Sequence, residues 1–77
     1  MVSLHDIPPG TYARLLVVGG EQSFRRRLME LGFLPGTRVR LVRRVDVGDL
    51  VELEVRGCHL SLRRAEAEQL FVERPGA

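Results

Sequence analysis

The alternation of hydrophobic and polar residues predicts a chain made of short strands. Residues 11–18 are rich in β-branched and aliphatic side chains and predict a strand that ends at Gly19-Gly20. Residues 37–45 and 50–56 alternate between apolar and charged positions, with a hairpin connection at 46–49. Residues 58–63 and 70–73 predict two further strands, separated by one helical turn at 65–69. We therefore expect a mainly β fold, a small barrel of five short strands.

One segment has a different period and predicts the single inserted helix, over residues 23–31. Its apolar residues are spaced i, i+4 and i+7 along one face: Phe24, Leu28 and Leu31. Ser23 is the expected N-cap, because its hydroxyl can accept a hydrogen bond from a free backbone N–H. We expect Gly32 to end the helix in the left-handed conformation, which would fold Phe33 back onto Leu28.

Arg43 departs from the alternation of its strand. It lies on the inward side, and this predicts either a β-bulge or the open end of the barrel, where a long side chain reaches water. If the inward faces of the hairpin match, the outward face pairs Arg44 with Glu52 or Arg40 with Glu54.

Length and composition indicate one globular domain spanning residues 1–77. The chain has 44% hydrophobic and 29% charged residues, which is ordinary for a folded domain. Cys58 is the only cysteine, so no internal disulfide can form. The N-terminus lacks a charged start followed by an apolar segment, and we therefore expect a cytoplasmic protein.

The inventory of reactive side chains is small, and we expect no enzyme activity, cofactor or metal site. Cys58 and His59 are neighbours, but adjacent residues of a strand point to opposite faces, so Cys58 is interpreted as a small buried hydrophobe. An Fe(II) site would need imidazole and carboxylate ligands in one place. The nearest set is the outward-facing Glu52, Glu54 and His59, for which pairing with arginines is the simpler interpretation.

The charge distribution leaves nucleic-acid binding as an alternative. The net charge is +2, all twelve basic residues are arginines, and the pI is about 9.5. Residues 21–45 carry seven arginines and two glutamates, whereas residues 46–77 carry four arginines and seven acids. Pairing across the hairpin would neutralise much of the basic strand, and what remains is Arg25-Arg26-Arg27. The chain has no Trp, one Tyr and three Phe, so no platform for base stacking is visible.

Several motifs together resemble those of the FeoA family. The segment Arg27-Leu28-Met29-Glu30-Leu31-Gly32-Phe33-Leu34-Pro35-Gly36-Thr37 resembles the family's Arg-Leu-x-x-Leu-Gly-hydrophobic-x-Pro-Gly signature. Further matches follow the family's order and are found at Leu4, Ile7 and Gly10, at Val47-Gly48-Asp49, at Val55-Arg56-Gly57, at residues 60–67, and at Leu70 and Val72. One departure is Leu50, where the family often has proline. The resemblance covers residues 4–73.

The resemblance implies an SH3-like β-barrel with an inserted helix and a non-enzymatic accessory role in bacterial ferrous iron uptake. It also implies a partner, the membrane iron transporter FeoB with its cytoplasmic GTP-binding domain, so membrane association would be through this partner only. The candidate contact residues are Arg25, Arg26, Met29 and Glu30 on the helix, and Phe71, which strand alternation places outside. A nucleic-acid-binding barrel and an Fe(II) chaperone remain as alternatives, and exposed strand edges leave self-association open.

Overall fold

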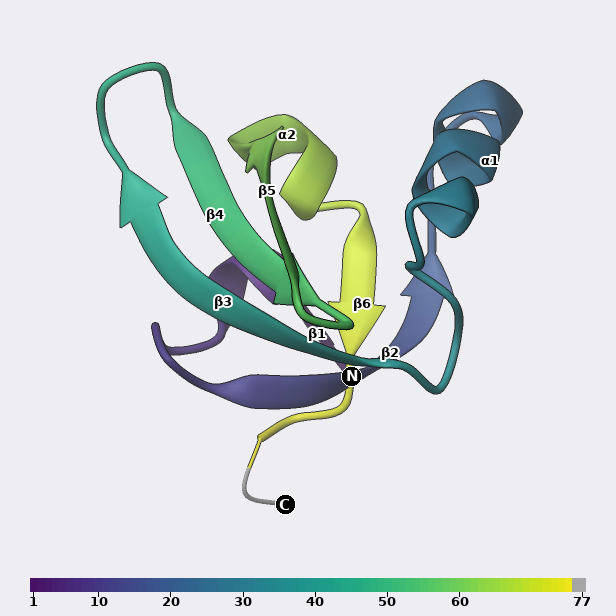
Figure 1. Ribbon diagram of the computed structural model, residues 1–77, viewed down its shortest axis with the longest axis horizontal. Helices are drawn as coiled ribbons and strands as arrows, with labels where there is room; N and C mark the ends of the chain where they lie inside the picture. Colours follow the sequence, from purple (N-terminus) through teal and green to yellow (C-terminus); the bar gives the residue numbers. More distant parts are fainter. Residues whose placement is uncertain (76–77) are drawn as a thin grey trace.

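The computed structural model describes residues 1–75 and consists of one curved sheet with two short α-helices (Figure 1). The elements are β1 (Val2–Ser3), the 3₁₀ helix η1 (Leu4–Asp6), β2 (Tyr12–Val18), α1 (Gln22–Glu30), β3 (Arg38–Val45), β4 (Leu50–Val55), β5 (Cys58–Arg63), α2 (Arg64–Ala67) and β6 (Leu70–Val72). The strand order is β1-β6-β2-β3-β4-β5, and all neighbours are antiparallel. The expected SH3-like barrel with an inserted helix is confirmed. The sheet has six strands, since the two-residue β1 gave no signal in the sequence.

The concave side of the sheet holds a wholly apolar core. Sixteen hydrophobic side chains are buried there, and within residues 1–75 no polar or charged residue is buried. The strand positions that the alternation predicted to face inward make up half of it: Val39, Leu41, Val51, Leu53, Val55, Leu62, Leu70 and Val72. Burial of these side chains is the main stabilising contribution to the fold.

The end of α1 follows the predicted glycine motif, whereas its start does not. The N–H of Phe33 donates to the carbonyl of Leu28 at 2.9 Å and the N–H of Gly32 donates to that of Met29 at 3.0 Å, which together form a Schellman motif. Phe33 is completely buried as a result. Ser23 is not the N-cap: the cap lies two residues earlier, at Glu21, which makes no side-chain hydrogen bond.

Leu31 is 51% exposed, so its predicted place in the core is wrong. The helix ends at Glu30, and the reversal at Gly32 brings Phe33 into the core in its place. Phe24 is half-buried against the core, and Leu28 is fully buried. Two of the three predicted helix positions therefore face the barrel.

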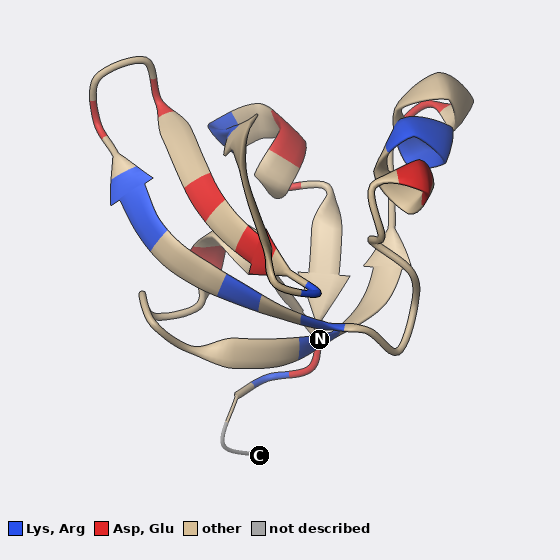
Figure 2. Cartoon of the chain, viewed as in Figure 1, with Lys and Arg blue, Asp and Glu red and all other residues tan. Residues whose placement is uncertain are grey.

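The predicted bulge is present and determines which charges pair across the hairpin. The register of β3 and β4 shifts between Leu41 and Arg43, so Arg43 is exposed and opposes Glu52, with their side chains 2.7 Å apart. Arg40 pairs with Glu54 as expected, also at 2.7 Å. The alternative pairing of Arg44 with Glu52 is wrong, because the extra residue places Arg44 opposite Val51. Figure 2 shows the basic bands of β3 beside the acidic bands of β4.

Cys58 is exposed, and its predicted burial is wrong. It opposes the buried Val55 beside the turn of the β4–β5 hairpin, on the edge strand of the sheet. In β5 only Leu62 is buried, while Leu60 packs partly against the core. Strand parity therefore described the middle of this strand correctly and its end incorrectly.

We expect Gly20→Ala to destabilise the fold more than Gly36→Ala. Both glycines have a φ of +91°, so both substitutions carry the cost of a left-handed alanine, about 1–3 kcal/mol. A Cβ at Gly20 would lie 2.9 Å from the Phe24 ring, whereas at Gly36 it would meet nothing within 4 Å. Urea unfolding of both variants measures the difference. Equal losses would show that the contact between residue 20 and the Phe24 ring is unimportant.

Candidate docking surface

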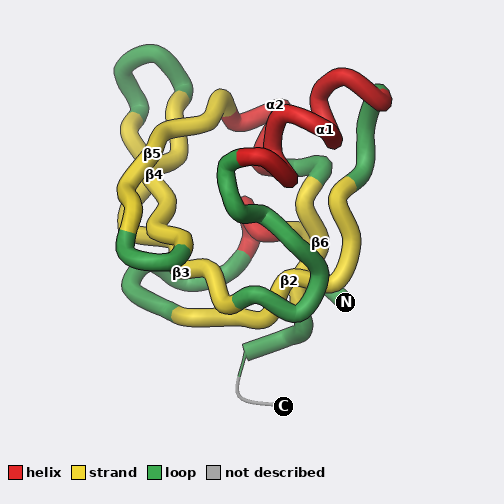
Figure 3. The backbone as a smooth tube through the Cα atoms, turned by 45° about the vertical axis from the view of Figure 1, so that its right-hand side comes forward, coloured by secondary structure: helices red, strands yellow, loops and turns green. Residues whose placement is uncertain are grey.

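Helix α1 lies beside the barrel and is attached to it along one side only (Figures 1 and 3). Leu28 and the half-buried Phe24 anchor its inner face. Arg27 joins α1 to α2 through an ion pair with Glu66 at 2.8 Å, and its guanidinium lies 5.6 Å from the centroid of the Phe24 ring. The rest of the helix surface faces solvent. Arg27 therefore helps to attach the helix to the barrel. Of the cluster Arg25-Arg26-Arg27, only the first two arginines are left without an ion-pair partner within residues 1–75.

These two arginines meet the predicted methionine. Arg25, Arg26 and Met29 are exposed and, with Gln22, line a shallow hollow of about 290 Å³. Neither arginine has an ion-pair partner within residues 1–75. Glu30 is exposed on the same helix but does not line the hollow. The structure thus brings three of the four predicted helix residues together.

Exposed apolar side chains are concentrated in the segment that contains α1. Seven large hydrophobic residues are exposed, and four of them lie in residues 17–34: Val17, Met29, Leu31 and Leu34. Leu31 and Leu34 belong to the turn that follows the helix. The sequence analysis assigned Leu31 to the core and so missed this contribution. We call the exposed area formed by Arg25, Arg26, Met29, Leu31 and Leu34 the α1 surface. Its apolar side chains beside unpaired arginines have the mixed chemistry typical of protein interfaces.

Phe71 is not part of this surface. It lies in the middle of β6, opposite Ser3 of β1 and Val17 of β2, and is half-buried. The sequence predicted that the ring points to the outside of the sheet. The ring is nevertheless only partly exposed, and β1 and β2 flank β6 on both sides. Phe71 therefore covers the outside of the sheet between two strands.

The outward carboxylates of β4 are already engaged with arginines. Glu54 accepts a hydrogen bond from Arg40 at 2.7 Å and lies 3.5 Å from His59. Burial acts to raise the pKa of Glu54, but the hydrogen bond and charge of Arg40, together with His59, outweigh it and lower the pKa. Glu52 pairs with Arg43. Residues 1–75 contain no group of three or more His, Cys, Asp or Glu side chains placed to hold a metal ion.

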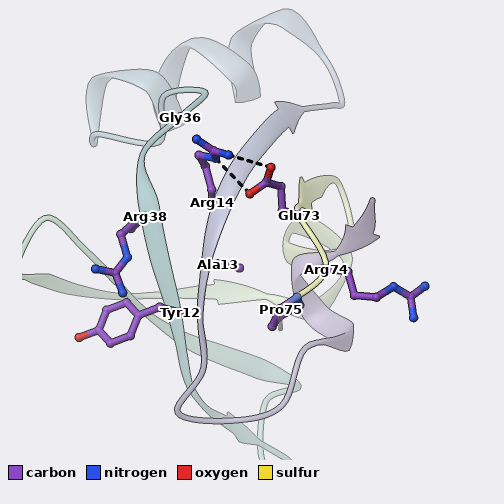
Figure 4. A pocket seen from close by; sticks show the side chains of 8 residues that line it. All are labelled: Tyr12, Ala13, Arg14, Gly36, Arg38, Glu73, Arg74 and Pro75. Carbon is purple, nitrogen blue, oxygen red and sulfur yellow. Dashed lines mark hydrogen bonds and ion pairs between the residues drawn. The ribbon is translucent and has the colours of Figure 1, made fainter. Parts of the chain in front are cut away.

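A second polar surface, which the sequence analysis missed, lies on the outer face of β2 and β3 (Figure 4). The guanidinium of Arg38 stacks over the Tyr12 ring at 4.5 Å from its centroid. Arg14 donates two hydrogen bonds to Glu73, at 2.8 and 3.1 Å. These residues are brought together by strand register and by the return of the chain after β6, which hydrophobic periodicity does not reveal.

The Arg14–Glu73 pair makes stability depend on pH. The hydrogen bond and charge of Arg14 lower the pKa of Glu73, so the pair stabilises the fold above the ordinary glutamate pKa and this contribution is lost as pH decreases through the lower, folded value. In thermal unfolding, we expect Glu73→Gln to lower Tm at pH 7 and the gap from wild type to narrow towards about pH 3. Glu68→Gln, which removes the surface ion pair between Arg64 of α2 and the C-cap residue of that helix, is the control. A difference in Tm between Glu73→Gln and wild type that stays constant with pH would contradict a stabilising role of the Arg14–Glu73 pair.

None of the helices in residues 1–75 has the length and apolar character that a membrane crossing requires.

Comparisons with known proteins identify the family. The model of the FeoA domain family matches residues 2–74. A curated relative, the Fe(2+) transport protein A/Fe(2+) transporter FeoB fusion protein of Porphyromonas gingivalis, is 31% identical over 70 residues, or 91% of this chain. The chain spans only 8% of the length of that relative.

Solved structures of FeoA proteins have the same fold. The FeoA protein of Chlorobium tepidum is 34% identical, with a TM-score of 0.87 and coverage of 99% of this chain and 71% of that one. The FeoA of Stenotrophomonas maltophilia, solved with zinc and described as a procaryotic SH3 domain protein, is 30% identical, with a TM-score of 0.78 and coverage of 95% and 91%. Sequence, family model and fold agree, and the chain belongs to the FeoA family.

Proposed function

We propose that residues 1–77 act as one non-enzymatic accessory domain of ferrous iron uptake that docks on the cytoplasmic side of a FeoB-type iron transporter. The observation that carries this proposal is the relative in which an Fe(2+) transport protein A and an Fe(2+) transporter FeoB form one polypeptide. Joining two domains in one polypeptide raises the effective concentration of each at the other. Such a fusion is an advantage when the two proteins act by binding to each other. Residues 76 and 77 of the proposed domain lie outside the described residues.

The α1 surface is the proposed contact with the transporter. Its hollow is lined by Arg25, Arg26 and Met29, and arginine and methionine are enriched in protein interfaces. The nearby exposed Leu31 and Leu34 add apolar area, and burial of apolar area would supply affinity. Since α1 is attached to the barrel along one side only, it can contact a partner without disturbing the core.

Co-purification tests the proposal. Membranes of a bacterium that expresses the transporter, solubilised in mild detergent, should retain the tagged chain, and antibodies against the transporter should detect it in the eluate. A tagged SH3-like domain of unrelated sequence is the control for nonspecific retention. Elution of the chain without the transporter, under conditions that keep the transporter folded, would contradict docking.

A further inference from the structure

Two hollows adjoin on the outer face of β2 and β3, and they share Tyr12 and Arg38. The first, of about 460 Å³, is also lined by Arg14, Glu73, Arg74 and Pro75 (Figure 4). The second, of about 390 Å³, is also lined by Glu54 and Arg56. We call the combined area the Tyr12 surface. It comprises strand residues, the turns before β3 and between β4 and β5, and the segment after β6, and it shares no lining residue with the hollow on α1.

The Tyr12 surface carries positive charge that the protein itself does not neutralise. Its two carboxylates are already used, because Glu73 binds Arg14 and Glu54 binds Arg40. The remaining arginines of the two hollows have no ion-pair partner within residues 1–75: Arg38, Arg56 and Arg74. Both hollows therefore present unengaged guanidinium groups to solvent.

The central guanidinium is held in place before any ligand arrives. Tyr12 lies under Arg38 at 4.5 Å and under Arg40 at 5.5 Å, measured from the ring centroid. Such stacking restricts a side chain that is otherwise highly flexible, so less conformational entropy is lost when Arg38 binds an anion. Tyr12 is 48% exposed, so its ring edge also remains available to a ligand. Tyrosine and arginine are the residue types most often found at the energetic centre of interfaces.

We propose that the Tyr12 surface binds an acidic peptide segment of a partner protein, with glutamate or aspartate side chains at Arg38, Arg56 and Arg74. Charge complementarity carries this choice, because carboxylates spaced along a peptide can pair with guanidinium groups that share their hollows with Glu54 and Glu73. A nucleic-acid strand fits less well, because its continuous phosphates would meet those two carboxylates. The face of the Tyr12 ring is also covered by Arg38, which leaves it unavailable for base stacking.

This inference goes beyond the proposed function, because it assigns a second surface and does not depend on the transporter. An array of immobilised decapeptides provides the test, with four glutamates each and varied apolar residues. The same peptides with glutamine in place of glutamate and the oligonucleotide dT10 are the comparison probes. We expect glutamate peptides to be retained at 50 mM salt, glutamine peptides and dT10 to be lost, and retention to weaken as salt rises.

Variants locate the binding. Arg38→Gln combined with Arg56→Gln should weaken binding of the best peptide at least tenfold, whereas Arg63→Gln, an exposed strand arginine outside both hollows, should change it less than twofold. Arg25→Glu on α1 should also leave it unchanged, which separates this surface from the proposed transporter contact. Circular dichroism establishes that each variant is folded. The proposal is overturned if no glutamate peptide binds, if dT10 binds more tightly, or if the double variant binds as wild type does.

Discussion

Phe33→Ala is expected to lower the free energy of unfolding by about 3–5 kcal/mol, the cost of removing a large aromatic ring from a fixed core. Phe33 is completely buried and is the largest of the fully buried side chains. Stability of about 0.05–0.15 kcal/mol per residue gives a 77-residue chain a total of about 4–12 kcal/mol. The loss is therefore a large share of the total, and Tm should decrease by more than about 12 °C.

Leu31→Ala is the matched control, because Leu31 is two residues away and 51% exposed. We expect its effect to be within about 0.5 kcal/mol, as for other surface substitutions. Phe33→Leu keeps most of the apolar volume and should remain measurable by urea unfolding even if Phe33→Ala does not fold. Equal stability of Phe33→Ala and Leu31→Ala would refute the role given to the turn after α1.

Reversing the charge of Arg25 and Arg26 together is expected to abolish docking on the transporter while the fold is retained. Both side chains are exposed and unpaired within residues 1–75, so their substitution leaves the core untouched. In the proposed interface, each reversal replaces an attraction with a repulsion, and like charges brought together cost several kcal/mol. Co-purification and iron-dependent growth of a strain that lacks its own copy of this protein measure the effect.

Arg63→Glu is the control for charge reversal, because Arg63 is an exposed strand arginine that does not line the hollow on α1. Met29→Ala tests the apolar part of the surface and should weaken docking with net charge unchanged. Full docking and full growth of the double variant would remove the α1 surface from the proposal. That result would not affect the assignment of the chain to the FeoA family.

The sequence predicted the elements whose side chains follow a regular period. β4 alternates cleanly and β3 does so as far as Leu41, and the inward positions Val39, Leu41, Leu53 and Val55 are all buried. The glycine motif after α1 was equally informative, because few residues other than glycine adopt its left-handed geometry. The inward parity of Arg43 predicted either a bulge or the open end of the barrel, and the structure has the bulge.

Features that depend on the end of an element or on its neighbours were not predictable in the same way. Cys58 has the strand parity of the buried Leu62 but is exposed beside the hairpin turn on the edge strand β5, so parity did not imply burial there. Leu31 continues the helical period one residue beyond the helix. The Tyr12 surface joins β2, β3 and the segment after β6, and only strand register places Tyr12 beside Arg38 and Arg40.

The charge pattern has a physical explanation in the fold. Two arginines of β3, Arg40 and Arg43, pair with glutamates of β4, and Arg27 and Arg14 join segments distant in the sequence. Of the arginines without an ion-pair partner within residues 1–75, two lie on α1 and three line the Tyr12 surface, whereas Arg44 and Arg63 lie outside both.

The most direct test of the account is the affinity of this chain for a purified FeoB-type transporter from the same bacterium, held in lipid nanodiscs and titrated at physiological salt. The account predicts saturable one-to-one binding that is lost in the Arg25→Glu, Arg26→Glu double variant and retained in Arg63→Glu. Absence of saturation up to about 1 mM, equivalent to less than about 4.1 kcal/mol of binding free energy, would contradict it.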